Sequence, residues 1–127
     1  VKMIILVDDD AVVNLCNQNL IQRNYPNIPI EIFENSTSAF EFVNNLKSQT
    51  SSGNDIIFFL DYQIPDMDGF ELMEEIENRE LDLDCNISVY LLTGKNSVLI
   101  QEKIKVFPMV KGFFEKPLTL GNLAGIF

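Results

Sequence analysis

Two uninterrupted runs of apolar residues dominate the pattern along the chain, and an aspartate ends each of them. Residues 3–7 precede Asp8, and residues 56–60 precede Asp61. An apolar run of this length, without polar alternation, predicts a strand that is buried on both faces. Such strands occupy the middle of a parallel sheet with helices on both sides. We therefore predict an α/β fold that places Asp8 and Asp61 at the carboxyl ends of central strands, where open α/β sheets bind ligands.

Three further strands are expected, each followed by a helical segment. Residues 30–33 form a short strand, and the acid inside it favours a place near the sheet edge. Residues 87–92 form a strand that ends on Thr93, and a short strand around residues 112–114 ends near Lys116. The result is five strand–helix units in one α/β sandwich, with residues 1–127 forming a single domain.

The first two helices follow from apolar spacing and from their ends. After Asp10, helical spacing puts Val13, Cys16 and Leu20 on one face, and Pro26 stops the helix. Asn35 or Ser36 can cap a second helix, and the polar residues 47–55 predict a mobile surface loop. The apolar side of the second helix is formed by Ala39, Phe40, Val43 and Leu46.

The later helices are less uniform. Residues 68–71 resemble a capping box, after which Leu72, Met73 and Ile76 face the core. A helix is expected over residues 98–106 and a weak one over residues 118–127, because two glycines in the last segment each cost about 1 kcal/mol relative to alanine.

Composition excludes several classes of function. The formal charge of -10, from nineteen acids and nine bases, argues against binding to nucleic acid. No apolar run approaches the roughly 18 residues of a membrane-spanning helix, and no signal peptide is evident. There is no histidine, and Cys16 and Cys85 are far apart, so a zinc site or a Cys–His nucleophile is not expected. We interpret both cysteines as small packing residues in a reducing cytoplasm.

Polar residues stand at four strand ends that a purely structural α/β domain would not require. They are Asp8 and Asp9, Asp61, Thr93, and Lys116. All strands of a parallel sheet end at the same edge, so these side chains should converge. Three carboxylates brought together repel one another, which raises their pKa values or attracts a cation. Mg²⁺ suits such a site, because it prefers oxygen ligands and binds carboxylates together with phosphate oxygens.

The combined set has the chemistry of phosphoryl transfer. Asp61 supplies a carboxylate nucleophile, and the metal, the Lys116 ammonium and the Thr93 hydroxyl supply positive charge and donors for the phosphoryl oxygens. We therefore predict that Asp61 is the reactive residue and that the rest of the chain positions it.

The chain also resembles the receiver domain of two-component response regulators, the chemotaxis type included. The matching motifs occur in the family's order and cover nearly the whole chain. They are Ile5-Leu6-Val7-Asp8-Asp9-Asp10, Phe59-Leu60-Asp61 with Pro65-Asp66-Met67-Asp68-Gly69, Leu91-Leu92-Thr93-Gly94, and Phe114-Glu115-Lys116-Pro117. The resemblance implies a flavodoxin-like, doubly wound sheet of five parallel strands in the order 2-1-3-4-5, in three layers.

The resemblance further implies a signalling role rather than that of a conventional enzyme. Asp61 would take a phosphoryl group from a histidine kinase or phosphotransfer protein, and the domain would assist both this transfer and the later dephosphorylation. Asp8, Asp9, Asp61 and the backbone carbonyl of Gln63 would bind Mg²⁺, Asp8 through water. Thr93 and Lys116 would hold the phosphoryl oxygens, and the Lys116–Pro117 bond would be cis.

The same resemblance implies a conformational switch. Thr93 would swing to the phosphoryl group and Phe113 would turn inward, which repacks the face made by the fourth helix, fifth strand and fifth helix. Five of the nine bases lie in the last third of the chain, so we expect this face to dock a less basic or acidic protein. These bases are Lys95, Lys103, Lys105, Lys111 and Lys116.

Two other functions are weighed against this prediction. In a haloacid-dehalogenase-type phosphatase, Asp8 would be the nucleophile and Asp10 the acid/base, but no acid follows Lys116 to complete the metal site and Asp61 would have no role. In a receiver-like module that binds a partner without phosphorylation, the intact set of site residues would be unnecessary. The chain is either a stand-alone regulator or part of a longer one. No DNA-binding segment follows the domain within it, so we expect its output to be protein binding in the cytoplasm.

Overall fold

A parallel sheet forms the centre of the computed structural model, which describes residues 3–46, 54–61, 69–79, 85–94, 102, 105 and 107–127. Its strands are β1 (Met3–Val7), β2 (Ile30–Phe33), β3 (Asn54–Asp61), β4 (Cys85–Thr93) and β5 (Val110–Glu115). All neighbouring pairs are parallel, and the order is β2-β1-β3-β4-β5. The predicted fold class and strand order are therefore confirmed, with β2 at an edge.

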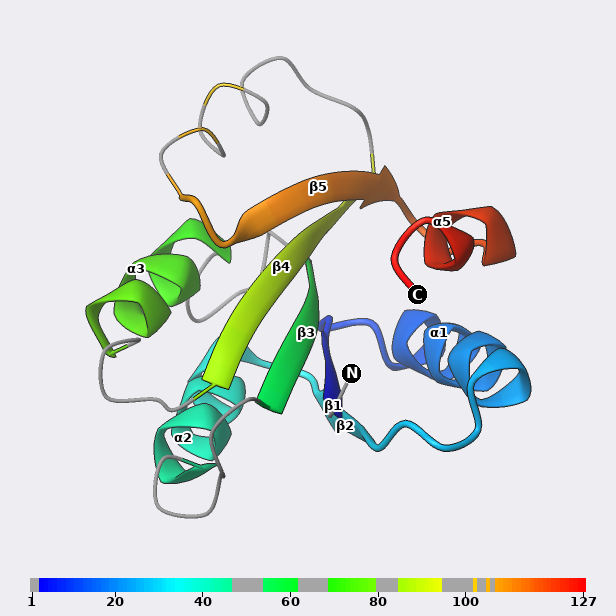
Figure 1. The fold of residues 1–127 in the computed structure, drawn as a ribbon, viewed down its shortest axis with the longest axis horizontal. Helices are drawn as coiled ribbons and strands as arrows, with labels where there is room; N and C mark the ends of the chain where they lie inside the picture. The colour runs from blue at the N-terminus through cyan, green and yellow to red at the C-terminus, as the bar shows by residue number, and fades with distance from the viewer. Residues whose placement is uncertain are drawn as a thin grey trace.

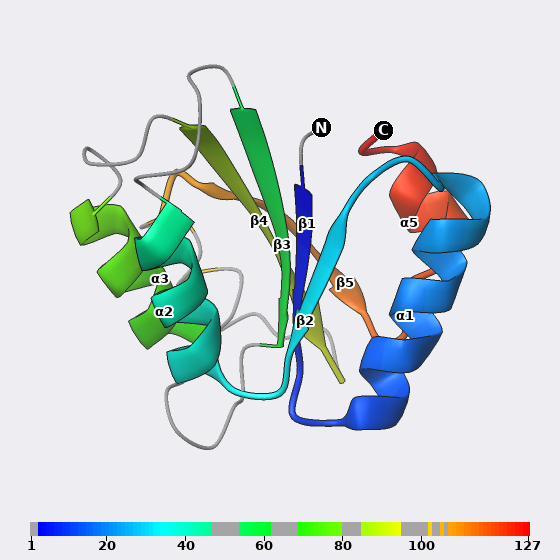
Figure 2. The same ribbon diagram turned by 90° about the horizontal axis from the view of Figure 1, so that it is seen from below.

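Helices cover both faces of the sheet (Figures 1 and 2). Helices α1 (Ala11–Asn24) and α5 (Leu120–Ala124) lie on one face, and α2 (Ser36–Leu46) and α3 (Gly69–Arg79) lie on the other. This arrangement gives the three layers that the sequence predicts. No helix among the described residues is long and apolar enough to cross a membrane.

Two apolar cores explain the uninterrupted apolar runs of β1 and β3. In β3, Phe58 and Leu60 pack into the core beneath α2 and α3, whereas Ile57 and Phe59 pack into the core beneath α1 and α5. Successive residues of a strand point to opposite faces, so a strand with helices on both sides has no solvated face. Burying each of these side chains fully contributes about 1.5–3 kcal/mol.

Three of the helices begin at a polar residue whose side chain accepts hydrogen bonds from the first backbone N–H groups of the helix. The Asp10 carboxylate accepts hydrogen bonds from the N–H groups of Val12 and Val13, and Asn35 Oδ1 accepts from Ser38 N–H at 2.8 Å. Thr119 forms a reciprocal capping box with Asn122 at the start of α5. These bonds satisfy backbone donors that have no partner inside the helix.

The predicted buried face of α1 is wrong by one position. The residues of this helix that are buried are Asn14, Asn17 and Ile21, whereas Cys16 is exposed and Val13 and Leu20 are only partly buried. The interpretation of Cys16 as a packing residue is therefore also wrong. Apolar spacing failed here because two polar side chains occupy the buried face, where each forms a hydrogen bond to another segment.

Several element boundaries also differ from expectation. β3 already begins at Asn54, so the end of the predicted loop pairs with β4 instead. β5 is longer than predicted, and α5 covers only Leu120–Ala124 because its cap at Thr119 sets a later start. The predicted capping box at Asp68, most of the helix over residues 98–106 and the loop over residues 47–53 lie outside the described residues.

Candidate functional site

The polar residues predicted at the strand ends meet at one edge of the sheet. Asp8 follows β1, Asp61 ends β3, Thr93 ends β4, and Lys116 follows β5. Because β1 pairs with β2 on one side and β3 on the other, the chain reverses its direction of winding between Asp8 and Asp61. Ligands of open α/β sheets bind at such a reversal.

The Lys116 ammonium joins the two buried carboxylates. Its Nζ lies 2.9 Å from Asp61 Oδ2 and 3.1 Å from Asp8 Oδ2. Asp8 and Asp61 are almost fully buried, at 1% and 4% exposure. One cation thus faces two buried anions, and the pair of carboxylates keeps an excess of negative charge.

The backbone holds Asp8 in place around this ion pair. Asp10 N–H donates to Asp8 Oδ1 at 2.9 Å, and Asp8 N–H donates to the Phe33 carbonyl at 3.1 Å. Burial nevertheless raises the pKa of the Asp8 carboxyl above its ordinary value of 3.8, and the neighbouring Asp61 charge acts in the same direction. The Asp10 N–H and Lys116 lower this pKa but do not cancel the effect of burial.

The pKa of Lys116 is also raised, which in this case favours the charged form of the side chain. Burial alone would lower the pKa of its ammonium, but the hydrogen bonds and charges of Asp61 and Asp8 outweigh burial and raise the pKa above 10.5. The ammonium therefore stays charged across the neutral range and is a permanent positive group at the edge of the sheet.

Three carboxylates fit the donor set of a hard divalent cation. Asp8, Asp9 and Asp61 each offer an oxygen, and these oxygens lie within 4.8 Å of one another. Asp9 is exposed while the other two are buried, so the group opens to solvent on one side. Oxygen ligands near a water-accessible surface suit Mg²⁺, which keeps several of its waters when bound.

Thr93 borders the same group. Its carbonyl accepts a hydrogen bond from Lys116 N–H at 2.9 Å, which ties the end of β4 to the residue that carries the ammonium. Its side chain is 1% exposed, and Oγ1 has no hydrogen-bond partner among the described residues. A buried hydroxyl without a partner is costly, so this one is ready to bond an incoming oxygen.

Residues 4–126 match the family model of the response regulator receiver domain. The chain belongs to this family. Receiver domains are signalling domains that are phosphorylated on an aspartate, and the family generally binds Mg²⁺ at an acidic cluster. A search of curated protein sequences found no match to this chain.

Solved structures support the receiver fold. A two-component response regulator from Cytophaga hutchinsonii is 23% identical, with a TM-score of 0.85 over 99% of this chain and 93% of that one. A two-component response regulator from Legionella pneumophila is 23% identical, with a TM-score of 0.79 over 100% and 95%. A CheY-like receiver domain protein from Methanospirillum hungatei is 19% identical, with a TM-score of 0.73 over 99% and 90%.

The resemblance to receiver domains also made predictions for Phe113, the Lys116–Pro117 bond and Gln63. Phe113 pairs with Leu91 in the sheet and is partly buried against the core beneath α2 and α3. The Lys116–Pro117 bond is cis, as the resemblance implies. Gln63, whose carbonyl is a predicted metal ligand, lies outside the described residues.

Sequence reasoning missed two buried asparagines beside the site. Asn14 Nδ2 donates to the Asp8 carbonyl at 2.8 Å, and Asn17 Oδ1 accepts from Leu118 N–H at 3.1 Å. Their spacing of three residues, continued by Ile21, could have indicated a shared face of α1. Apolar spacing pointed to the neighbouring face instead.

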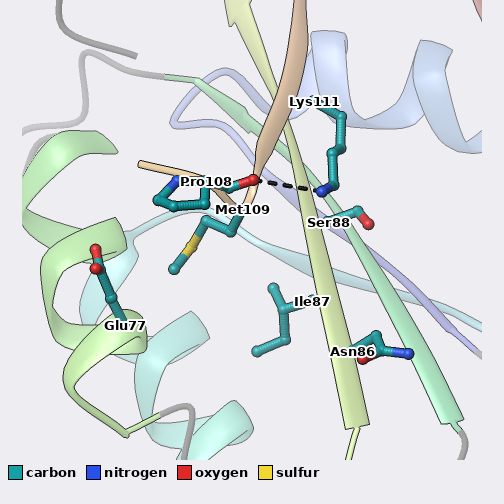
Figure 3. A pocket seen from close by; sticks show the side chains of 7 residues that line it. All are labelled: Glu77, Asn86, Ile87, Ser88, Pro108, Met109 and Lys111. Carbon is teal, nitrogen blue, oxygen red and sulfur yellow. Dashed lines mark hydrogen bonds between the residues drawn. The ribbon is translucent and has the colours of Figure 1, made fainter. Parts of the chain in front are cut away.

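A separate cavity of about 280 Å³ lies near the amino ends of β4 and β5 (Figure 3). It contains none of the predicted site residues, and Lys111 Nζ donates to the Pro108 carbonyl at its rim. The residues that line it are Glu77, Asn86, Ile87, Ser88, Pro108, Met109 and Lys111. Because the carboxylates stand at the opposite ends of the strands, this cavity is not part of the acidic site.

Proposed function

We propose that residues 1–127 are one receiver domain in which Asp61 accepts a phosphoryl group from a histidine kinase or phosphotransfer protein. The observation that carries this proposal is the Lys116 ammonium, 2.9 Å from Asp61 and 3.1 Å from Asp8 at the buried ends of parallel strands. A structural domain has no need for two buried carboxylates around one lysine, because such groups cost desolvation energy.

The transfer is a displacement at phosphorus. An oxygen of the Asp61 carboxylate attacks the phosphorus of a phosphohistidine, and an acyl phosphate forms as the P–N bond breaks. The electron pair of that bond stays on the histidine nitrogen. Because the other ring nitrogen of the donor carries a proton, the histidine leaves as neutral imidazole. Lys116 neutralises charge on the phosphoryl oxygens, and the buried Thr93 hydroxyl donates to one of them.

The acidic group would hold the metal for this reaction. Asp9 and Asp61 would bind Mg²⁺ directly with the Gln63 carbonyl, and Asp8 would bind it through water. When bound, Mg²⁺ supplies the positive charge that offsets repulsion between the carboxylates and the phosphoryl oxygens. The same residues would assist the later hydrolysis of the acyl phosphate, so the domain is a signalling protein with a self-limiting active state.

Phosphorylation would then change the packing of β5. Thr93 moves toward the phosphoryl group, and the partly buried Phe113 turns further inward beside it. This motion would repack the face that includes α5 and β5. The fourth helix that the resemblance assigns to the same face lies largely outside the described residues. A downstream protein in the cytoplasm would read that face.

A phosphorylation assay tests the proposal. The chain is incubated with Mg²⁺ and acetyl phosphate, and intact mass is compared with that of Asp61→Asn. We expect one Mg²⁺-dependent phosphoryl adduct that is absent in Asp61→Asn. Beryllofluoride, which mimics the phosphoryl group, should shift the amide NMR signals of Thr93 and Phe113 in the parent protein.

The alternatives give different results. Steady phosphate release that survives Asp61→Asn but requires Asp8 would favour a phosphatase. Mg²⁺ binding without an adduct would favour a module that binds partners independently of phosphorylation. Asp10, the acid/base of the phosphatase alternative, already accepts the N-terminal hydrogen bonds of α1, which speaks for a structural role.

The phosphodonor would dock beside the site on α1 and α5. Val12 and Leu15 of α1 and Leu120 of α5 are large apolar residues at 67%, 54% and 51% exposure. Exposed apolar groups next to a reactive edge suit a partner protein. Leu15→Asp should slow transfer from a histidine kinase but leave the reaction with acetyl phosphate unchanged; equal loss with both donors would contradict docking.

The output face carries exposed positive charge at two described positions. Lys111 is exposed on β5, and Lys105 is exposed but lies 3.7 Å from Glu102, which reduces its net charge locally. Charge reversal at Lys111 should therefore lower the affinity for an acidic partner more than charge reversal at Lys105 does. A titration with the phosphorylated domain measures both; unchanged affinity in both variants would exclude electrostatic docking on this face.

A further inference from the structure

Two buried asparagines of α1 reach from the helix to the segments that carry Asp8 and Lys116. Asn14 and Asn17 are 2% and 1% exposed, and they stand one turn apart on the buried side of α1. Asparagine is a poor residue for a helix interior, and a buried amide is costly unless it forms hydrogen bonds. An aliphatic side chain would serve packing better at either position, so packing alone does not explain this pair.

Asn14 holds the end of β1. Its Nδ2 donates to the Asp8 carbonyl at 2.8 Å and lies 3.4 Å from the Phe33 carbonyl at the end of β2. The Asp8 N–H donates to the same Phe33 carbonyl. Asn14 therefore fixes the carbonyl of Asp8 from α1, while the end of β2 fixes the N–H of Asp8.

Asn17 holds the segment after β5. Its Oδ1 accepts from Leu118 N–H at 3.1 Å, in a buried hydrogen bond that joins α1 to a residue near the other end of the chain. Lys116 N–H is bound to the Thr93 carbonyl, and Pro117 has no N–H. The short segment from Lys116 to Leu118 is thus anchored at both ends, once on β4 and once on α1.

We propose that Asn14 and Asn17 are positioning residues for phosphoryl transfer, Asn14 for the Asp8 carboxylate and Asn17 for the Lys116 ammonium. This inference rests on the proposed function of Asp61. The two asparagines set the distance between a group that follows β1 and a group that follows β5, which are not neighbouring strands. A displacement of about 1 Å in such a group can cost roughly 100-fold in rate.

The two positions predict different losses. Asn17→Leu removes the acceptor for Leu118 N–H, so phosphorylation of Asp61 by acetyl phosphate at saturating Mg²⁺ should slow roughly 10- to 100-fold, with Mg²⁺ affinity nearly unchanged. Asn14→Leu frees the Asp8 carbonyl, so Mg²⁺ affinity should fall roughly 10-fold or more. Amide NMR shifts during a titration with Mg²⁺ report this affinity without any phosphorylation.

The control is Asn19→Leu, which makes the same change at an exposed position of α1. It should alter neither the rate nor the Mg²⁺ affinity. Asn17→Asp keeps an acceptor oxygen for Leu118 N–H and should recover part of the rate lost in Asn17→Leu. In Asn17→Leu the Leu118 amide should also shift and exchange its proton faster. Asn17→Ala removes the same acceptor without added bulk and replaces Asn17→Leu if that variant does not fold.

The outcomes separate the two proposals. A parent protein that is phosphorylated, with Asn17→Leu as fast as Asn19→Leu, would overturn the positioning role and leave the function of Asp61 intact. If the loss of rate in each variant is proportional to its loss in free energy of unfolding, and Asn17→Asp restores no rate, the asparagines have only a structural role. A parent protein that takes no phosphoryl group would overturn the function of Asp61 and the positioning role with it.

Discussion

At the residue scale, the site is built on an electrostatic conflict. Asp8 and Asp61 are buried close together, and the single ammonium of Lys116 contacts both. Burial raises the pKa of Asp8, which means that the folded protein disfavours its charged form. Such an arrangement lowers stability unless a cation binds, so the conflict is consistent with a site selected for function.

Neutralising Asp8 should stabilise the protein in the absence of Mg²⁺. In Asp8→Asn the free energy of unfolding at about pH 7 should rise by something of the order of 1 kcal/mol, because the variant buries an amide instead of a carboxylate. The gain should shrink as the pH falls below the raised pKa of Asp8 and vanish below 3.8, where this carboxyl is protonated in both states. Urea unfolding with a chelator, over a series of pH values, measures this.

The exposed neighbour Asp9 provides the control for this prediction. Asp9→Asn removes the same charge one residue away, outside the buried pair, and should change stability by less than about 0.5 kcal/mol. A loss of stability in Asp8→Asn at neutral pH would contradict the prediction. It would show that the Lys116 contact contributes more to the fold than the burial of the carboxylate costs.

At the element scale, the helix that begins beside the acidic group depends on its cap. Asp10 Oδ1 accepts from Val12 N–H at 2.9 Å, and Asp10 N–H holds Asp8 Oδ1. One residue thus starts α1 and orients the carboxylate before it. The side chain of Asp10 has the first task and its backbone the second, so a substitution separates them.

Asp10→Ala should lower the free energy of unfolding by about 1 kcal/mol, the usual cost of losing an N-cap. Phosphorylation of Asp61 should persist, because the backbone N–H that binds Asp8 remains. Asp10→Ser, which keeps a cap, should restore most of the stability. Measurements of unfolding and of phosphorylation by intact mass test both points, and loss of all reactivity in both variants would support a chemical role for Asp10.

At the scale of the whole molecule, the sheet depends on side chains that are buried on both faces. Phe58 in β3 is fully buried in the core beneath α2 and α3. Phe58→Ala should cost about 3–5 kcal/mol, because it removes buried apolar surface and leaves a cavity. Val12→Ala, at a position that is 67% exposed, should change stability by less than about 0.5 kcal/mol. Thermal and urea unfolding measure the stability of each variant. Similar losses of stability in Phe58→Ala and Val12→Ala would contradict the burial of Phe58 in this core.

Metal binding should also be visible in the stability of the whole chain. Mg²⁺ that binds only the folded state should add about 2.7 kcal/mol at 100 times its dissociation constant. Asp9→Asn should lose most of this gain, since it replaces the exposed carboxylate of the acidic group with a neutral amide. Equal stabilisation of parent and variant would place the bound Mg²⁺ elsewhere.

The sequence by itself determined the fold and most of the site. Apolar runs that end on aspartate predict buried parallel strands, and parallel strands end at one edge, so Asp8, Asp61, Thr93 and Lys116 had to converge. Their position depends only on strand direction, which local pattern specifies well. The start of α1 after Asp10 was likewise evident from the chain.

Only the tertiary structure decided which face of α1 is buried and what holds the site together. Asn14 and Asn17 bind carbonyl and N–H groups of Asp8 and Leu118, and the value of those bonds depends on segments remote in sequence. A pattern of apolar residues assigns buried positions by hydrophobicity and therefore passes over amides that form hydrogen bonds with distant partners. The exposure of Cys16 and the contacts of Lys116 with both carboxylates also depend on how segments remote in sequence pack together, so they became known only from the folded chain.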